Sequence, residues 1–106
     1  MAKRAKKSAA MRALDRAAGG PETFGGLLQA IRLGEEETLE VFAARLGVTR
    51  AHLCDVEKGR RSVSVERAAK WANVLGYHPP SFVELALQDA VAAAGLKLRV
   101  AVKPAA

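Results

Sequence analysis

Apolar residues recur along this chain at intervals of three and four, the period that places them on one face of an α-helix. The period is clearest between Leu39 and Glu57, where the sequence reads LEVFAARLGVTRAHLCDVE. Gly47 interrupts it and supplies a residue suited to a left-handed turn. The pattern therefore predicts two short helices, over 39–46 and 50–57, joined by a tight turn.

Seven positions in this stretch meet the requirements of two helices that cross closely. Ala43 is small enough for the second helix to pass above it, and Gly47 makes the turn. The other five positions would bury one stripe of each helix: Phe42, Leu46, Val48, Leu53 and Val56. Since 50% of the chain is hydrophobic, no single position is informative, but their agreement predicts a helix-turn-helix.

Capping and stop residues predict further helices on both sides of this motif. Ser64 would cap a helix that Gly76 ends, and Ser81 with Glu84 forms the pattern of a capping box for the next helix. Trp71 is predicted to be buried in the first of these two. The predicted ranges are 21 or 23–33, 65–75 and about 81–94, with a short helix over 9–18 nearer the N-terminus.

The last residues change from the helical period to strict alternation. Residues 96–103 read LKLRVAVK, with apolar side chains at every second position. This alternation predicts a β-strand. An isolated strand leaves its backbone groups unpaired, so it would pair with the same strand of a second subunit or with the edge of a protein partner. The alternative is a frayed terminus.

Length and charge fit one small domain with an anionic partner. The chain has 106 residues, a formal net charge of +6 and a pI near 10.0. Residues 1–16 hold six Lys or Arg against one Asp, so much of the charge lies in an N-terminal arm. Such an arm either follows phosphates or a minor groove, or is a solubilising tail. Its first basic residues are Lys3, Arg4, Lys6 and Lys7.

The sequence gives no indication of a membrane or of an oxidising compartment. Cys54 is the one cysteine, so the chain can form no internal disulfide. No apolar run reaches the length of a membrane span, and the first residues lack the apolar core of a signal peptide. We therefore expect a cytoplasmic protein of bacterial or phage origin.

The motif and its surroundings resemble the Xre-like, or phage-repressor-like, helix-turn-helix regulators over about residues 27–87. In that family an arginine ends the first helix six residues before the cap of the second, as Arg32 and Thr38 do here. The reading helix is followed by Glu, a polar residue, Gly and basic residues, and this chain has EKGRR at 57–61. The resemblance implies a bidentate salt bridge between Arg32 and Glu57.

This resemblance and the element pattern together predict an all-α fold. We expect a five-helix, lambda-repressor-like helix-turn-helix bundle over 21–95. A basic arm with a short helix would precede it at 1–20. A C-terminal β-strand and tail would follow at 96–106 and make a contact with a second subunit or another protein.

The resemblance also assigns DNA contacts to the second helix of the motif. Arg50 and Ala51 would point to base edges in the major groove, Arg50 toward guanine and Ala51 toward the thymine methyl group. Asp55 would lie further along as a third base-reading residue. Thr49 and His52 would contact phosphate, although His52 could equally be solvated. Three basic residues of the following loop would add salt-dependent backbone contacts: Lys58, Arg60 and Arg61.

Two positions depart from the family. Leu39 replaces a frequent glutamine that binds phosphate, so those hydrogen bonds are lost. Asp55 places a carboxylate on the groove face, where it repels phosphate unless it accepts from cytosine N4 or pairs with His52 or Lys58. We expect a lower affinity for DNA, or a stronger rejection of wrong sequences.

An enzyme is not expected. His52 and Cys54 are two residues apart on a helix and point in different directions, so they form neither a metal pair nor a nucleophile with its base. No cofactor fingerprint, metal-ligand spacing or small-ligand site is evident. We expect a repressor that binds a palindromic operator in double-stranded DNA as a homodimer. The alternative is an antitoxin that binds DNA and also neutralises a protein toxin.

Overall fold

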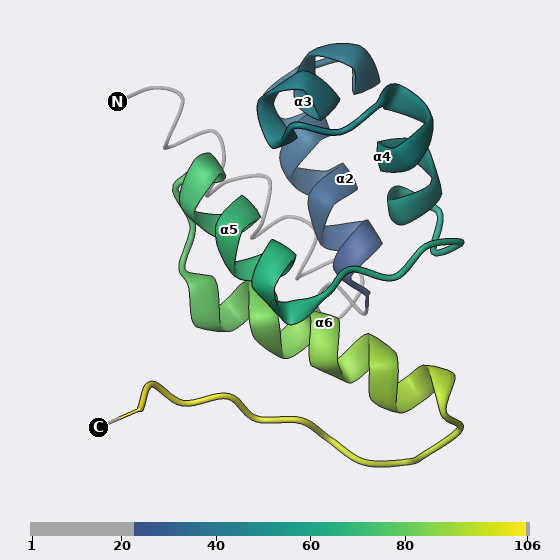
Figure 1. Cartoon of the computed structure of the whole chain (residues 1–106), viewed down its shortest axis with the longest axis vertical. Coiled ribbons are helices and arrows are strands. Elements are labelled where there is room, and N and C mark those ends of the chain that lie inside the picture. Colours follow the sequence, from purple (N-terminus) through teal and green to yellow (C-terminus); the bar gives the residue numbers. More distant parts are fainter. Residues whose placement is uncertain (1–22, 106) are drawn as a thin grey trace. The chain divides into compact units, whose positions relative to one another are not determined.

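The computed structural model describes residues 23–105, and this part of the chain is helical, as predicted (Figure 1). The predicted arm at 1–20, with its basic residues Lys3, Arg4, Lys6 and Lys7, lies outside the described residues. The chain divides into two compact units, one ending at Arg61 and one beginning at Ser62. The helices are α2 (Phe24–Gly34), α3 (Leu39–Leu46), α4 (Arg50–Glu57), α5 (Val65–Leu75) and α6 (Pro79–Ala93).

The helix ends follow local signals in the sequence. Hydroxyl side chains cap the first turns of α2 to α5 by accepting from a backbone amide three residues on, which satisfies a donor that the helix itself leaves unpaired. Gly47 and Gly76 follow α3 and α5 in the left-handed conformation, at φ 75° and 80°. The capping residues are Thr23, Thr38, Thr49 and Ser64.

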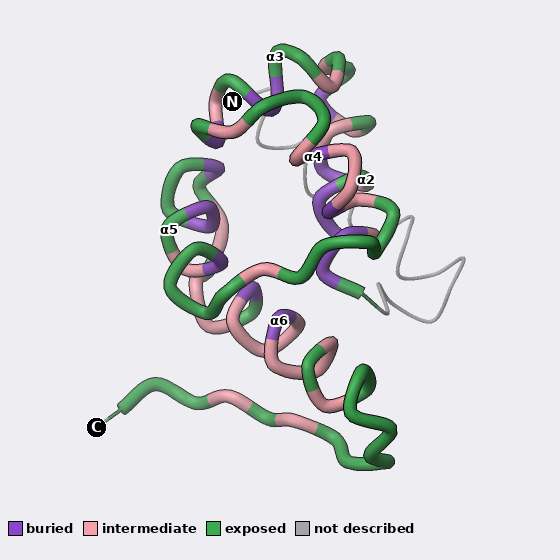
Figure 2. Tube along the Cα trace, turned by 45° about the vertical axis from the view of Figure 1, so that its right-hand side comes forward, coloured by how far each residue is buried: buried purple, intermediate pink, exposed green. Residues whose placement is uncertain are grey.

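The first unit buries one stripe from each of its three helices. Buried positions recur along these helices, as the purple stretches of the trace show (Figure 2). Ala43 of α3 is buried, in agreement with its predicted place at a close crossing. The buried apolar side chains of this unit are Phe24, Leu27, Leu28, Ile31, Phe42, Ala43, Leu46, Leu53 and Val56.

Gly25 allows an approach of α2 to the end of α4 that the sequence pattern does not predict. A Cβ atom at this position would overlap the carbonyl oxygen of Val56 and lie 2.8 Å from that of Glu57. Both of these atoms belong to the backbone, which cannot move aside as a flexible side chain can. Gly25 is therefore required by packing.

The second unit pairs α5 with α6. Trp71 is 1% exposed, which confirms that it belongs to the core, and Phe82 of α6 is equally buried. Tyr77, in the turn between the two helices, stacks on Phe82 with ring centroids 5.9 Å apart. The remaining buried apolar residues of this unit are Ala68, Ala72, Leu75 and Ala86.

The start of α6 differs from the predicted one. The helix begins at Pro79, with His78 as an N-cap that makes no side-chain capping bond, whereas a capping box at Ser81 was expected. Proline is tolerated in the first turn of a helix because its missing N–H has no partner there, and its fixed φ suits the helix. Glu84 does not complete a capping box and instead accepts a hydrogen bond from the amide of Val102.

The predicted C-terminal β-strand is wrong: no residue of 96–105 is in a strand. The segment instead runs back along α6 (Figure 1), held by side chains of that helix. Gln88 donates from Nε2 to the carbonyl oxygen of Leu98 at 2.9 Å and accepts from the amide of Val100 at 2.8 Å. The carboxamide of Gln88 thus supplies both a donor and an acceptor to the segment, as the backbone of a neighbouring strand would. Gln88 and Glu84, one helical turn apart, therefore hydrogen-bond to backbone groups of the segment that the alternating pattern predicts to be paired with a neighbouring strand.

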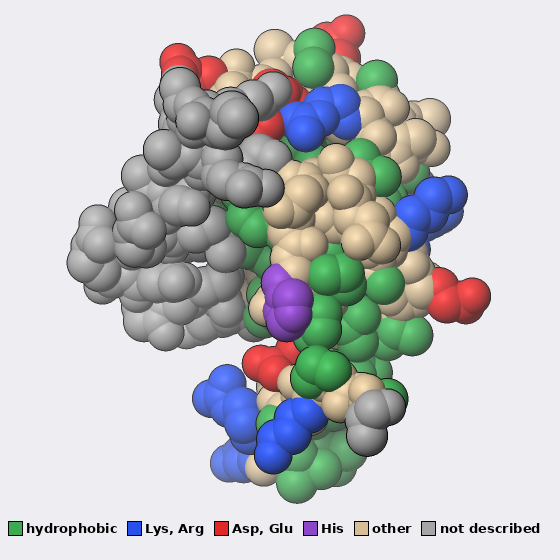
Figure 3. Space-filling view, turned by 90° about the vertical axis from the view of Figure 1, so that its left-hand side faces the viewer, with side chains coloured by type: hydrophobic (Ala, Val, Ile, Leu, Met, Phe, Trp, Pro, Cys, Tyr) green, Lys and Arg blue, Asp and Glu red, His purple; other side chains and the backbone are tan. Residues whose placement is uncertain are grey.

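Basic side chains are exposed along this C-terminal segment. Figure 3 shows Lys and Arg side chains gathered at the lower end of that view, at the level of the segment. The exposed basic residues there are Lys97, Arg99 and Lys103, and residues 96–106 contain no acid.

Candidate nucleic-acid interface

The inner face of α4 fixes the helix within the first unit. Leu53 is 0% and Val56 2% exposed, and α4 packs against both α2 and α3. These two residues lie three apart, the spacing of a single helix face. The buried stripe leaves the opposite side of α4 directed away from the core.

An ion pair joins α2 to the last turn of α4. Arg32 donates from Nε to Oε2 of Glu57 at 2.8 Å and from Nη2 to Oε1 at 3.0 Å, the bidentate pair that the resemblance implies. Arg32 also donates to the carbonyl oxygen of Glu37. The hydrogen bond to Glu57 raises the pKa of Arg32 above its usual value, so the guanidinium keeps its charge. The pair holds α4 at a fixed angle to α2.

A second group of charges braces the connection between α2 and α3. Arg45 donates from Nη1 to Oε1 of Glu35 at 2.7 Å and to Oε2 of Glu37 at 2.8 Å. The Glu35 side chain is fully buried. Both acids thus bind α3 through Arg45. The sequence pattern does not indicate these pairs, because ten and eight residues separate the partners.

The outer face of α4 carries the residues assigned to base reading. At about 100° per residue, Ala51 lies opposite the buried stripe, Asp55 lies one turn further on, and Arg50 lies at one flank. Arg50 and Ala51 are exposed in the first turn of the helix. No described residue pairs with the Arg50 side chain in residues 23–105. Its donor fork is therefore unpaired within the described residues.

The predicted phosphate contacts surround this face. Thr49 is exposed and caps α4, accepting from the amide of His52 at 3.1 Å. The His52 side chain is half-buried at one flank of the helix. The basic residues of the loop after α4 are all exposed: Lys58, Arg60 and Arg61.

Gly59 turns this loop back toward α4. Its φ of 78° is a left-handed conformation, which glycine adopts without steric cost. The amides of Arg60 and Arg61 then donate to the carbonyl oxygen of Asp55, at 2.8 and 3.2 Å. The basic loop is thus attached to the last turn of α4 and extends its outer surface.

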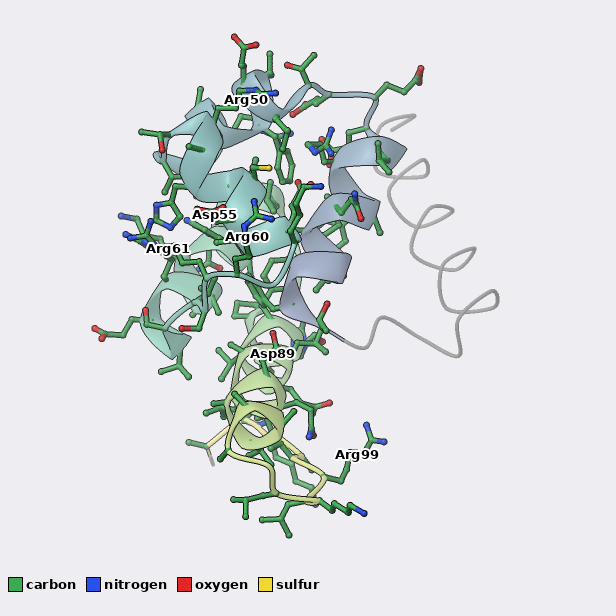
Figure 4. The ribbon with its side chains drawn as sticks, turned by 90° about the vertical axis from the view of Figure 1, so that its right-hand side faces the viewer. Arg50, Asp55, Arg60, Arg61, Asp89 and Arg99 are labelled. Atoms are coloured by element: carbon green, nitrogen blue, oxygen red, sulfur yellow. The ribbon has the colours of Figure 1, made fainter. Side chains whose placement is uncertain are left out.

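Asp55 pairs with Arg60, which is neither of the two partners that the sequence suggested. Nη2 of Arg60 lies 2.8 Å from Oδ1 of Asp55, and Nε lies 2.9 Å from the same oxygen. The bond to Asp55 raises the pKa of Arg60. Figure 4 shows the two side chains together near the end of α4, with Arg50 at its other end. Sequence reasoning missed this contact because it depends on the turn at Gly59.

The described part of the chain shows neither a metal site nor a membrane-spanning helix. No three His, Cys, Asp or Glu side chains there are grouped so that they could hold a metal ion. Each helix within residues 23–105 is too short or too polar to cross a lipid bilayer. Cys54 is a free thiol on α4, half-buried, with Nη2 of Arg60 at 4.0 Å.

Comparison with known families identifies this arrangement. A family model described as Helix-turn-helix matches residues 28–82, more than half of the chain. The matched range starts in α2, includes α3, α4 and α5, and ends in the first turn of α6. Searches of curated proteins and of solved structures returned no match. The chain belongs to the Xre-like helix-turn-helix family of DNA-binding transcriptional regulators.

Proposed function

We propose that this protein is a repressor that binds a palindromic operator as a homodimer, with α4 of each subunit in a major groove. The observation that carries the proposal is the division of α4 into two faces. One face is buried and fixed by the Arg32 pair, and the other presents Arg50 and Ala51 from its first turn. A fixed helix with exposed donors at its N-terminus is the form in which helix-turn-helix proteins read bases.

Arg50 is the principal base-reading residue in this proposal. Its planar fork matches the O6 and N7 acceptors of guanine, a contact worth about 1 to 3 kcal/mol against a wrong base. Ala51, beside it on the outer face, offers a methyl group that suits contact with a thymine methyl. Both residues are exposed, so neither has to leave the core to reach DNA.

The surrounding residues contact the sugar-phosphate backbone. Thr49 and His52 lie in or just before the first turn of α4, and Lys58 and Arg61 lie in the loop that Gly59 returns to the helix. Contacts of this kind set the orientation of the helix without choosing a sequence. In the same proposal, the N-terminal arm adds contacts from Lys3, Arg4, Lys6 and Lys7.

A homodimer matches a palindromic operator because both have twofold symmetry. The two half-sites would lie about 34 Å apart, one turn of DNA, so that both copies of α4 enter the same side of the duplex. The C-terminal segment supports a subunit contact because two large apolar side chains there are exposed, Leu96 at 53% and Leu98 at 61%. Repression would follow from blocking access of polymerase to the operator.

Capture of genomic DNA tests the proposal. Fragments of host DNA would be bound by the purified protein at physiological salt, eluted and sequenced. We expect enrichment of one palindrome with half-sites one helical turn apart, and two subunits per duplex by sedimentation. Enrichment of single half-sites bound by one subunit would contradict the homodimer. Enrichment of no sequence would contradict sequence-specific binding. An enriched site beside a toxin gene would favour an antitoxin instead.

A further inference from the structure

We propose that Asp55 is a positioning residue that holds Arg60 as a second guanine reader, in addition to Arg50. This inference rests on the proposed function, since it requires α4 to lie in the major groove. It replaces the phosphate contact that the sequence assigns to Arg60. The observation behind it is a loop arginine folded onto the outer face of the reading helix and held there by a carboxylate.

The pair leaves one donor edge of the guanidinium available. Arg60 donates from Nε to Oδ1 of Asp55 at 2.9 Å, and Nη2 lies 2.8 Å from the same oxygen. Guanidinium carries five N–H donors in a planar fork. On its end edge, formed by Nη1 and the second hydrogen of Nη2, Nη1 has no partner among the described residues, and the one further contact of Nη2 is a long one, to Sγ of Cys54 at 4.0 Å. That edge presents two parallel donors, the arrangement that binds O6 and N7 of guanine.

Two further contacts determine where this edge lies. The amide of Arg60 donates to the carbonyl oxygen of Asp55 at 2.8 Å, so the arginine begins directly beside the helix. Nη2 lies 4.0 Å from Sγ of Cys54, so the guanidinium lies over the outer surface of α4. Asp55 is one turn after Ala51 on that surface. Arg60 thus shares a face with the residues assigned to bases (Figure 4).

The charge of the Asp55–Arg60 pair favours a contact of Arg60 with a base over a contact with a phosphate. The opposite charges of Asp55 and Arg60 largely cancel at the distance of a neighbouring phosphate, so the pair adds little net attraction to the DNA backbone. Arg61, the next residue, has no carboxylate partner in residues 23–105 and keeps its full attraction. The Arg60 side chain is nevertheless 58% exposed, so its donors can reach a base edge.

The experiment begins with duplexes that the wild-type protein selects from a random library. Dissociation constants for the best duplex and for a shuffled duplex are then measured at several salt concentrations, and their ratio is taken as the specificity. The variants are D55A, D55N, R60A, R60K and the double variant D55A/R60A. R61A is the matched control because it removes a neighbouring unpaired charge. Circular dichroism confirms that each variant is folded.

We expect D55A and R60A each to lower the specificity about tenfold. The double variant should lower it no further, because both substitutions remove the same contact, that of Arg60 with guanine. D55N changes the charge as D55A does but keeps an oxygen that accepts from Arg60. It should therefore retain more specificity than D55A. R60K keeps the charge without the planar fork and should behave like R60A. The salt slope should stay unchanged in R60A and fall by about one unit in R61A.

Three results would overturn this inference while leaving the proposed function intact. One is a D55A variant that binds both duplexes more tightly by the same factor, which would make Asp55 only a repulsive charge. Another is an R60A variant whose salt slope falls as in R61A, which would make Arg60 a phosphate contact. The third is equal specificity in D55A and D55N. A wild-type protein that selects no duplex would overturn both proposals.

Discussion

The inner and outer faces of α4 each carry an arginine–carboxylate pair, but in different surroundings. On the inner face, the side chains of Arg32 and Glu57 are 13% and 4% exposed, and the contact is bidentate. On the outer face, those of Arg60 and Asp55 are 58% and 40% exposed, and two nitrogens of Arg60 lie against a single carboxylate oxygen. The same chemical pairing therefore serves two purposes, one within the fold and one at its surface.

The difference in exposure determines what each pair contributes. An exposed ion pair adds little to the free energy of unfolding, because water screens both charges. A buried pair is costly to break from one side, because the remaining charge stays in a place with little water. Changes on the inner face should alter stability first, and changes on the outer face should alter DNA binding without altering stability.

Gly25→Ala should have the largest effect on stability. The added Cβ overlaps the backbone at Val56, so α2 and α4 must separate, at a cost of about 3 kcal/mol in the free energy of unfolding. Chemical denaturation followed by circular dichroism measures this cost. Gly26→Ala is the matched control, because its Cβ would meet only the Thr23 hydroxyl, at 3.0 Å. Equal stability of the two variants would show that α2 does not need this close approach.

Arg32→Ala should have the next largest effect. It leaves the Glu57 carboxylate, 4% exposed, without its main partner and should cost about 2 kcal/mol, less than for a fully buried pair because Arg32 is partly exposed. The pKa of Arg32 is raised on folding, so its contribution is present below the usual arginine pKa and is lost only at strongly alkaline pH. The destabilisation should therefore persist at neutral pH.

The Arg32→Met, Glu57→Leu double variant separates the charge effect from the loss of contact. It removes both charges while keeping apolar volume, and it should recover most of the stability lost in Arg32→Ala. A double variant as unstable as the single one would mean that packing around Arg32, and not the unpaired carboxylate, causes the loss.

Arg50→Ala tests the outer face. We expect wild-type stability, together with a loss of about 1 to 3 kcal/mol in binding to the selected duplex and a relaxed preference at one base pair. Binding assays with duplexes substituted one base pair at a time measure both effects. Wild-type affinity for the selected site would place α4 in a different register on the DNA.

Arg61→Ala should have the smallest effect on specificity. It removes an exposed charge of the loop and should weaken binding to all duplexes alike, with a salt slope lower by about one unit. Titrations at several salt concentrations measure the slope. A change confined to one duplex would mean that Arg61 reads a base.

Most of the helical framework could be predicted because its signals are local. The caps at Thr38, Thr49 and Ser64 act over three residues, and Gly47 and Gly76 end helices through their own backbone conformation. The prediction was wrong at the start of α6, where a capping-box pattern at Ser81 was preferred to the prolines before it. The prolines and the capping-box pattern are both local signals for a helix start, and only the folded structure shows that the helix starts at the prolines.

The candidate site divides in the same way. The exposure of Arg50 and Ala51 follows from their place on an amphipathic helix, which the sequence shows by its apolar period. The pairing of Asp55 with Arg60 requires the loop to turn at Gly59 and return to the helix. A charged residue has several partners within reach along the sequence, and the path of the backbone selects among them.

By itself, then, the sequence determined the helix-turn-helix, the buried stripe of α4 and the family, because these depend on residue type at short, regular spacings. Only the tertiary structure decided that Gly25 lies against the backbone of α4, that Asp55 holds Arg60, and that Gln88 and Glu84 bind the C-terminal segment. Each of these contacts joins separate stretches of chain. Alternation at 96–103 suggested a strand. Backbone N–H and C=O groups can bond to any suitable partner, however, and in the folded chain side chains of α6 are the partners of this segment.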